Sequence, residues 1–331
     1  MQDDRMAMPV PDEAGAKASL GHVLVSSMRD EGPYALEFVA HHRAIGFDRI
    51  FIASNDCRDG TDLLLDALDR AGAIIHHRST VAPGEVPQHA AYAAMRKAHG
   101  LDRADWLMVL DADEFLDVCT GQGKVQDLTA ATEESVDIVM LNARTFGTGD
   151  DPQWQPGLVT DQFTRRLPER HRANGPVKTL TRGIGRFRQI HNHSVMGYRG
   201  DRDLLVMRAD GSTFAIPPGG KLWAFLRNVP VEDIRYGMAH YNHYAVKSLA
   251  SFLLRQDRGR GAAPKGQQND RHTYRYFDRI AGAGIRDTGF GQRHGARLQA
   301  EYARLMDIPK VAAAQAETER RHAALIEALA G

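Results

Sequence analysis

The sequence is poor in cysteine and lacks a long uncharged apolar run. Its two cysteines, Cys57 and Cys119, are too few for a disulfide framework and badly spaced for a zinc cluster, as is typical of a reducing compartment. No stretch of about 18 apolar residues predicts a membrane-spanning helix, and no apolar core of signal-peptide type stands near the first residue. We therefore expect a cytoplasmic protein, for which peripheral contact with a membrane stays open.

An excess of charge of one sign is also missing. The sequence has 42 Lys and Arg residues against 42 Asp and Glu residues, so no overall field attracts nucleic acid. With 331 residues, of which 43% are hydrophobic, the chain can form a large core. Disorder is therefore excluded, nucleic acid is not an expected partner, and any binding of anions must be local.

Apolar runs alternate with helix-like segments in the first third of the sequence. The runs lie at residues 22–28, 49–53, 73–77 and 106–110. This alternation predicts an α/β fold with a mostly parallel central sheet that is covered on both faces. Less regular strand candidates at 138–141, 177–180, 187–190 and 204–207 predict a mixed extension of the sheet, and helices finish the chain.

The triplet Asp111-Ala112-Asp113 directly follows the apolar run 106–110. Ligands of open α/β sheets bind at the carboxyl ends of strands, and residues two apart in an extended segment point to the same side. Two neighbouring carboxylates attract a hard divalent cation, which can bridge to phosphate oxygens. Asp-x-Asp is also common in solvated turns, so its position after a strand is what favours a metal site.

Polar loops follow the first two strands at the same predicted edge. They cover residues 26–31 and 54–61 and could hydrogen-bond a nucleobase and a ribose. Asp30 and Asp59 are equally suited to cap the helices that follow.

Taken together, these segments resemble a known family. The segments in the first half are Arg29-Asp30-Glu31-Gly32, His41-His42-Arg43-Ala44-Ile45-Gly46, Asn55-Asp56-Cys57-Arg58-Asp59-Gly60-Thr61 and Leu110-Asp111-Ala112-Asp113-Glu114-Phe115. The distal part adds His240-Tyr241-Asn242-His243-Tyr244-Ala245-Val246-Lys247-Ser248, Phe252, Arg255 and Arg258-Gly259. The set resembles bacterial family 2 glycosyltransferases of GT-A fold, in particular the subgroup related to family 92. Arg255 stands where that subgroup often has Lys.

The resemblance implies an inverting glycosyltransferase that uses a nucleotide-sugar donor, a glycan or glycolipid acceptor, and Mn²⁺ or Mg²⁺. Asp113 would bind the metal directly, and Asp111 would hold the ribose or a metal-bound water. His240 is the first choice for a third metal ligand and His193 the alternative. The expected donor-binding residues are Ser27, Arg29, Glu31, Asn55, Asp59, Asp111, Lys178, Lys247, Arg255 and Arg258.

Inversion also requires a general base that deprotonates the acceptor hydroxyl. The sequence leaves this residue open, with Asp201 and Asp203 weakly preferred. The other candidates are Glu114, Asp161, Glu232 and Asp233.

The resemblance also suggests a division of the chain. We expect a polar arm at 1–20, a catalytic domain at 21–260 and a helical appendage at 261–331. The domain would consist of a donor half at 21–118 and an acceptor and metal-completing half at 119–260. The Gly-rich segment 258–266 could close over the donor or form a plain loop, and the last helix could support a homodimer or dock on a membrane-bound partner.

Three other functions remain as alternatives. A nucleotidyltransferase usually has a Gly-rich basic loop after its first strand, which residues 22–32 lack. A phosphatase with paired aspartates is disfavoured because Glu114-Phe115 follows Asp113. A catalytically silent nucleotide- or carbohydrate-binding protein would have less reason to keep both aspartates.

Overall fold

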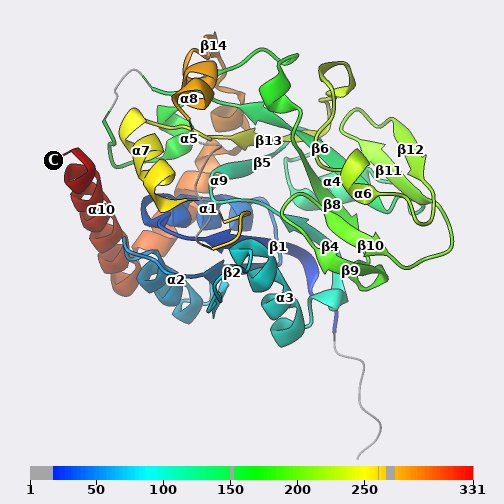
Figure 1. Cartoon of the computed structure of the whole chain (residues 1–331), viewed down its shortest axis with the longest axis horizontal. Coiled ribbons are helices and arrows are strands. Elements are labelled where there is room, and N and C mark those ends of the chain that lie inside the picture. Colours follow the sequence, from blue (N-terminus) through cyan, green and yellow to red (C-terminus); the bar gives the residue numbers. More distant parts are fainter. Residues whose placement is uncertain (1–17, 150–152, 260, 266–272, 331) are drawn as a thin grey trace, which may run out of the picture.

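Strands and helices alternate through the first third of the computed structural model (Figure 1). The structure describes residues 18–149, 153–259, 261–265 and 273–330. Proline in the first turn starts α1 and α3, and Gly100 in a left-handed conformation ends α3. The alternating elements are β1 (Gly21–Met28), α1 (Gly32–Ala44), β2 (Arg49–Ser54), α2 (Thr61–Arg70), β3 (Ile75–Arg78), α3 (Pro87–His99) and β4 (Ala104–Val109).

The remaining elements are further strands, several short helices and two long C-terminal helices. They are β5 (Glu114–Val118), α4 (Val125–Ala130), β6 (Ile138–Thr145), α5 (Val159–Gln162), β7 (Arg165–Arg166), β8 (Val177–Arg182), β9 (Phe187–Ile190), β10 (Val195–Tyr198), β11 (Leu204–Arg208), β12 (Thr213–Ile216), α6 (Leu222–Phe225), β13 (Ala239–His243), α7 (Leu249–Arg258), α8 (Tyr274–Ala281), β14 (Ile285–Arg286), α9 (Gly289–Met306) and α10 (Pro309–Ala330).

Within the described residues, ten strands form one sheet in the order β12-β11-β6-β8-β4-β1-β2-β3, with β13 pairing β6 and β5 pairing β13. The neighbours β4, β1, β2 and β3 are parallel. β8 is antiparallel to both β4 and β6, so β6 runs in the direction of β1, and β11 and β13 pair with β6 in parallel. The predicted fold class, α/β with a mostly parallel sheet and a mixed extension, is therefore confirmed, although β5 and β13 were not predicted.

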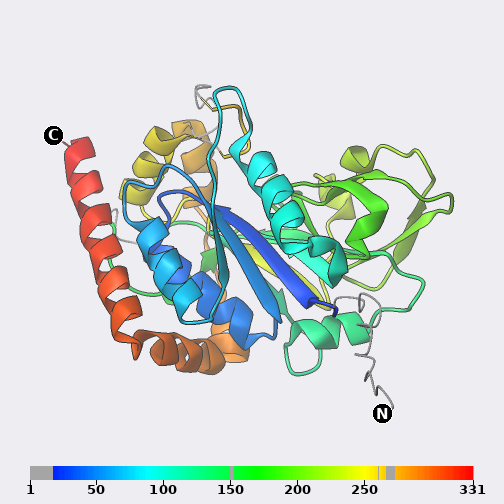
Figure 2. The ribbon, with the colours of Figure 1, turned by 90° about the horizontal axis from the view of Figure 1, so that it is seen from below.

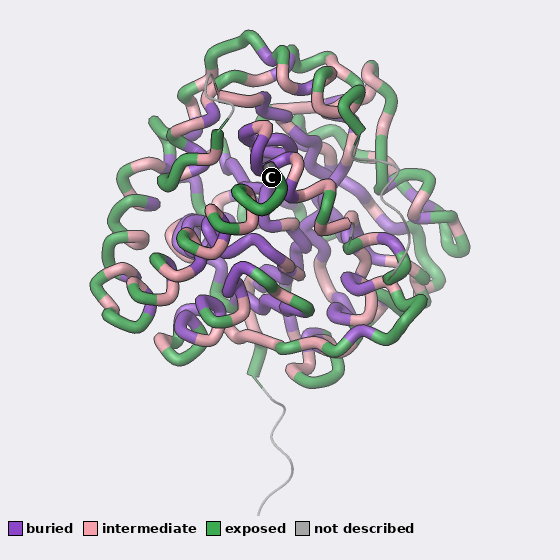
Figure 3. Tube along the Cα trace, turned by 60° about the vertical axis from the view of Figure 1, so that its left-hand side comes forward, coloured by how far each residue is buried: buried purple, intermediate pink, exposed green. Residues whose placement is uncertain are grey.

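Alternate residues of β1 pack on opposite faces of the sheet. Leu24 belongs to a core with α1 and α2, whereas Val23 and Val25 pack with α3 and β9. Figure 3 shows the buried residues gathered in the interior of the molecule and the exposed residues around its outside.

The C-terminal helices cover the α1 face. α9 contacts α1, and α10 contacts α1, α2 and α7, as Figure 2 shows along the outer side of α2. Their apolar side chains belong to the same core as Leu24: Phe290, Leu298, Leu305 and Val311. The divisions of the chain at residues 118 and 260 stay predictions, and most of the predicted arm, residues 1–17, lies outside the described residues.

In the part of the chain that the structure describes, none of the helices combines the length and apolar character needed to cross a bilayer.

Candidate functional site

A cleft of about 160 Å³ opens where β1, β2 and β4 end. This is the sheet edge at which we predicted a ligand site, because the carboxyl ends of parallel strands meet there. The predicted residues that line the cleft are Ser27, Arg29, Glu31, Asn55, Asp111, Asp113, Glu114, His193, Arg255 and Arg258. Residues from both halves of the sequence thus meet in one cleft.

The Asp111-Ala112-Asp113 triplet forms a turn between β4 and β5, not the extended segment that we predicted. The backbone N–H of Glu114 donates to the carbonyl of Asp111 at 3.0 Å and closes the turn. The turn is required because β5 leaves the parallel block to pair with β13. Both aspartates nevertheless line the cleft.

Asp113 is buried and faces two basic side chains. Arg255 of α7 donates to its Oδ2, and His243 Nε2 of β13 lies 3.7 Å from the same oxygen. Burial alone would raise the pKa of Asp113, but Arg255, His243 and Lys247 hold it well below the usual range. The carboxylate is therefore ionised at neutral pH.

Asp111 belongs to a second network. Its Oδ1 accepts a hydrogen bond from Gln88 at 2.8 Å, and its Oδ2 accepts one from Lys178 at 3.1 Å. The buried Lys178 ammonium is also 2.7 Å from Glu114 Oε2. Lys178 therefore fixes the turn from beneath instead of lining the cleft.

Arg258 holds the loop after β1. It lies at the end of α7 and donates to the carbonyl of Asp30 at 3.1 Å and to Glu31 Oε1 at 2.5 Å. The buried Nε of Arg29, in the same loop, has no hydrogen-bond partner among the described residues. Part of this basic surface is thus available to an anionic ligand.

Besides Lys178, two other predicted donor-binding residues lie outside the cleft lining. Asp59 accepts hydrogen bonds from the backbone N–H of Gly32 at 2.8 Å and of Thr61 at 2.9 Å, which is the helix-capping role left open above. Lys247 lines a small cavity of about 10 Å³ behind Glu31 and Arg258, with its ammonium 4.3 Å from the Tyr34 ring centre. Burial lowers the pKa of Lys247.

The structure places the two histidines of β13 beside different aspartates. On β13, His240 pairs in register with Asp117, and His243 pairs with Glu114. The two side chains are three residues apart on an extended strand, so they point to opposite faces of the sheet. His243, which we did not select, lies beside Asp113. Had β13 been recognised as a strand, the alternation of its side chains between the two faces of the sheet would have separated His243 from His240.

The alternative ligand His193 does line the cleft. Its Nδ1 lies 2.9 Å from the carbonyl of Val177, and its ring meets Trp223 edge-on.

The preferred bases, Asp201 and Asp203, are exposed and precede β11. Because β11 runs in the direction of β1, they lie at the amino ends of the strands, on the edge opposite the cleft. Of the six candidate acids, all of them described, only Glu114 lines the cleft. Its Oε2 already accepts from the backbone N–H of Asp111 at 2.8 Å, and burial raises its pKa to about 7.

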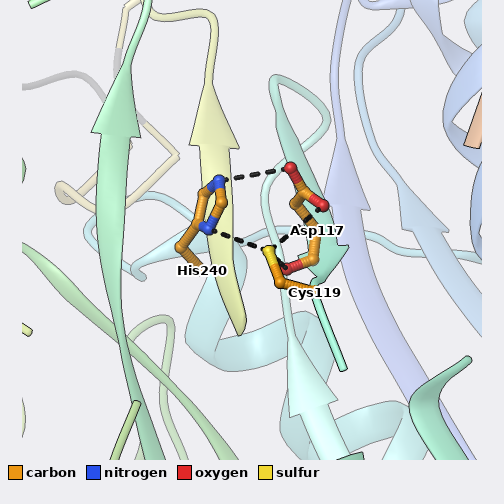
Figure 4. Close-up of side chains that lie close together, drawn as sticks. All are labelled: Asp117, Cys119 and His240. Atoms are coloured by element: carbon orange, nitrogen blue, oxygen red, sulfur yellow. Dashed lines mark hydrogen bonds and ion pairs between the residues drawn. The ribbon is translucent and has the colours of Figure 1, made fainter. Parts of the chain in front are cut away.

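A group of Asp117, Cys119 and His240 lies beyond the cleft, on β5 and β13 (Figure 4). His240 Nε2 is 3.2 Å from Asp117 Oδ2, and Cys119 Sγ is 3.7 Å from His240 Nδ1. Such residue types can hold a metal. Two features oppose it: desolvation and the Asp117 carboxylate raise the pKa of the Cys119 thiol to about 11, although the residue is exposed, and Arg293 donates to Asp117 Oδ1 at 2.8 Å and to Oδ2 at 2.5 Å.

The cleft fits a hard divalent cation better. Asp111 and Asp113 offer carboxylate oxygens and His243 a nitrogen, and Asp113 is ionised. Asp111, Asp113 and His243 are therefore the cleft residues that could hold the predicted Mn²⁺ or Mg²⁺, although both Asp111 oxygens also accept hydrogen bonds from Gln88 and Lys178.

The fold and the cleft thus define an α/β protein with two aspartate carboxylates and several arginine side chains at the carboxyl ends of parallel strands. No family model matches the chain. A glycosyltransferase family 92 protein from Ricinus communis is 29% identical over 208 residues, which is 59% of this chain. The chain spans only about a third, 36%, of that relative's length.

Solved structures give weaker matches. TarS 1–349 from S. aureus in complex with UDP-GlcNAc is 12% identical, with a TM-score of 0.28 over 41% of this chain and 37% of that chain. A second structure of TarS 1–349 is 11% identical, with a TM-score of 0.31 over 50% of this chain and 47% of that chain. A cytidylyltransferase from Leptospira borgpetersenii is 11% identical, with a TM-score of 0.27 over 49% and 60%. Scores this low carry no argument about fold or ligand.

Proposed function

We propose that the chain is an inverting glycosyltransferase that moves a sugar from a nucleoside-diphosphate donor to a hydroxyl of a glycan or glycolipid. The family 92 glycosyltransferase that matches over 208 residues supports this reaction class. The inverting stereochemistry and the GT-A assignment follow the resemblance of the sequence segments given above.

The charged side chains that line the cleft are the main support for this proposal. The cleft is lined by four acids, among them Asp111 and Asp113, and by the guanidinium groups of Arg29, Arg255 and Arg258. Carboxylates suit a divalent cation, and guanidinium groups suit phosphate oxygens. A diphosphate with a cation on it is the ligand that needs both at once.

The roles follow from position. Arg29, Arg255 and Arg258 would bind the diphosphate, and Ser27 and Asn55, at the ends of β1 and β2, would hydrogen-bond the nucleoside. Asp111 and Asp113 would hold the divalent cation, which when bound stabilises the negative charge of the leaving diphosphate. Lys178 and Glu114 would keep Asp111 oriented from below.

The experiment is release of nucleoside diphosphate from a panel of nucleotide-sugars, with Mn²⁺ and with the metal chelated. We expect slow metal-dependent donor hydrolysis and, for Asp113→Asn, a loss of about 100-fold or more, because the cation contributes several kcal/mol of charge stabilisation. A thermal shift with donor and Mn²⁺ selects the nucleotide beforehand.

Each alternative gives a different result. Release of pyrophosphate would identify a nucleotidyltransferase, and a thermal shift without any turnover would identify a binding protein. Full activity of Asp113→Asn with the metal chelated would show that the metal role is wrong.

A further inference from the structure

Asp113 already forms an ion pair with a basic side chain of the protein. Arg255 donates to its Oδ2, and the same guanidinium nitrogen donates to the carbonyl of Ala245 at 2.8 Å. The pair lies at the wall of the cleft, which both residues line. The Arg255 guanidinium thus occupies Oδ2 of the carboxylate to which a metal ion would bind.

Even without a metal ion, the positive charges around the Arg255–Asp113 pair are nearly balanced by negative charges. Arg258 pairs with Glu31, Arg255 pairs with Asp113, and the Lys247 ammonium lies over the Tyr34 ring. A divalent cation at Asp113 would add two positive charges within reach of Arg255 and Lys247. Like charges at that spacing repel strongly where water is scarce.

We infer that Arg255 and the divalent cation compete for Asp113, so that cation binding turns the Arg255 guanidinium from the carboxylate toward the cleft. This inference rests on the proposed function. The bond to Ala245 holds one nitrogen of the guanidinium, and the buried Nε has no hydrogen-bond partner among the described residues. That nitrogen is one donor that a phosphate oxygen in the cleft would satisfy.

The consequence is a site that binds its cation weakly until the diphosphate arrives. Without an anion to accept Arg255, the cation must displace a charge-assisted hydrogen bond. With the diphosphate bound, the guanidinium has a second acceptor and Asp113 becomes free for the metal.

The test measures Mn²⁺ affinity of the free protein, in the absence of any nucleotide, from the electron paramagnetic resonance signal of unbound Mn²⁺. We expect Arg255→Gln to bind Mn²⁺ about tenfold more tightly than the wild type, since one competing charge is removed. Arg255→Met, a second neutral side chain, should do the same if the Gln variant folds poorly.

Two matched variants serve as controls. Arg255→Lys keeps the charge and should stay within about twofold of the wild type, as should Arg258→Gln, which removes a cation bound to Glu31 and not to Asp113. Equal tightening by Arg255→Lys and Arg255→Gln would show that charge is not the cause and would overturn the inference.

Unchanged or weaker Mn²⁺ binding by both neutral variants also overturns it, as does the lack of any binding by wild type and variants. The proposed function fails separately. If the wild type hydrolyses no nucleotide-sugar while the neutral variants still bind Mn²⁺ more tightly, the competition stands and the glycosyl transfer does not.

Discussion

Asp113 and Asp117 lie at the two ends of one short stretch, and the structure uses them differently. Both are buried, both accept hydrogen bonds from an arginine, and both stand near a histidine of β13. At Asp117, Arg293 occupies both oxygens and His294 Nε2 lies 3.0 Å from Oδ1. At Asp113, the contacts of Arg255 and His243 converge on Oδ2, and the residue lines the cleft.

The comparison shows that residue types do not separate a ligand site from a structural cluster. Asp117 with Cys119 and His240 has the composition of a metal centre, yet its carboxylate is saturated by the protein. Asp113 has fewer partners and a cleft before it. Three experiments test this distinction between a ligand site and a structural cluster.

The largest effect is expected at Asp117. Replacing it by Ala leaves the partly buried Arg293 guanidinium and the buried His240 and His294 rings without their acceptor. Breaking a buried ion pair on one side costs about 3–5 kcal/mol, so we expect a loss of that order in the free energy of unfolding, measured with urea.

Mn²⁺ affinity of the folded Asp117→Ala protein should stay unchanged. The matched control is Glu317→Ala, which removes a partly exposed carboxylate paired with Arg320 and Arg321, and it should leave stability unaltered. A loss of Mn²⁺ binding by Asp117→Ala without a loss of stability would reverse the assignment of the two clusters.

The second effect separates the two histidines of β13. We expect His243→Ala to weaken Mn²⁺ binding about tenfold, because this ring supports or completes the ligand set at Asp113. His240→Ala should leave Mn²⁺ binding unchanged and lower stability, because its ring faces Asp117.

Isothermal titration of both variants with Mn²⁺ checks this pair of outcomes. If His240→Ala weakened binding and His243→Ala did not, the prediction made from the sequence would be right and the placement proposed from the structure wrong.

Local patterns predicted much of the fold and the edge of the site. The apolar runs of the first third became β1 to β4, and Asp111 and Asp113 line the cleft at their carboxyl ends because strand direction alone places them there. His240 lies beside Asp117 and not beside Asp113, a placement that could not be foreseen because β13 and β5 were not recognised as strands. Glu114 and Asp117 are buried acids within β5, so the strand has no readable apolar alternation.

The partners of these acids could not be predicted at all. Asp117 meets Arg293 and His294 of α9, far along the chain, and Glu114 meets Lys178 of β8. At these two acids the basic partners are brought close only by the tertiary fold, and nothing in the neighbouring sequence encodes them.

The smallest effect is expected at Glu37, a buried carboxylate that pairs with no basic side chain among the described residues. Glu37 of α1 accepts hydrogen bonds from the backbone N–H of Val159 at 2.6 Å and of Thr160 at 3.0 Å, and no salt bridge reaches it among the described residues. Burial therefore raises the pKa of Glu37 from 4.5 to about 7, whereas the pKa of Asp117 is held well below its usual range against the effect of burial.

The sign of the effect on stability follows from this shift. Between pH 4.5 and about 7 the folded protein keeps a proton on Glu37 that the unfolded chain has lost, so the free energy of unfolding falls as pH rises through this window and levels off above it. We expect this component to be about 1–3 kcal/mol and to vanish in Glu37→Gln. Urea denaturation from pH 5 to 8 measures it, with the exposed Glu134→Gln as control, and a Glu37→Gln variant with the pH dependence of the wild type would show that Glu37 does not behave as a buried carboxylate without a cation.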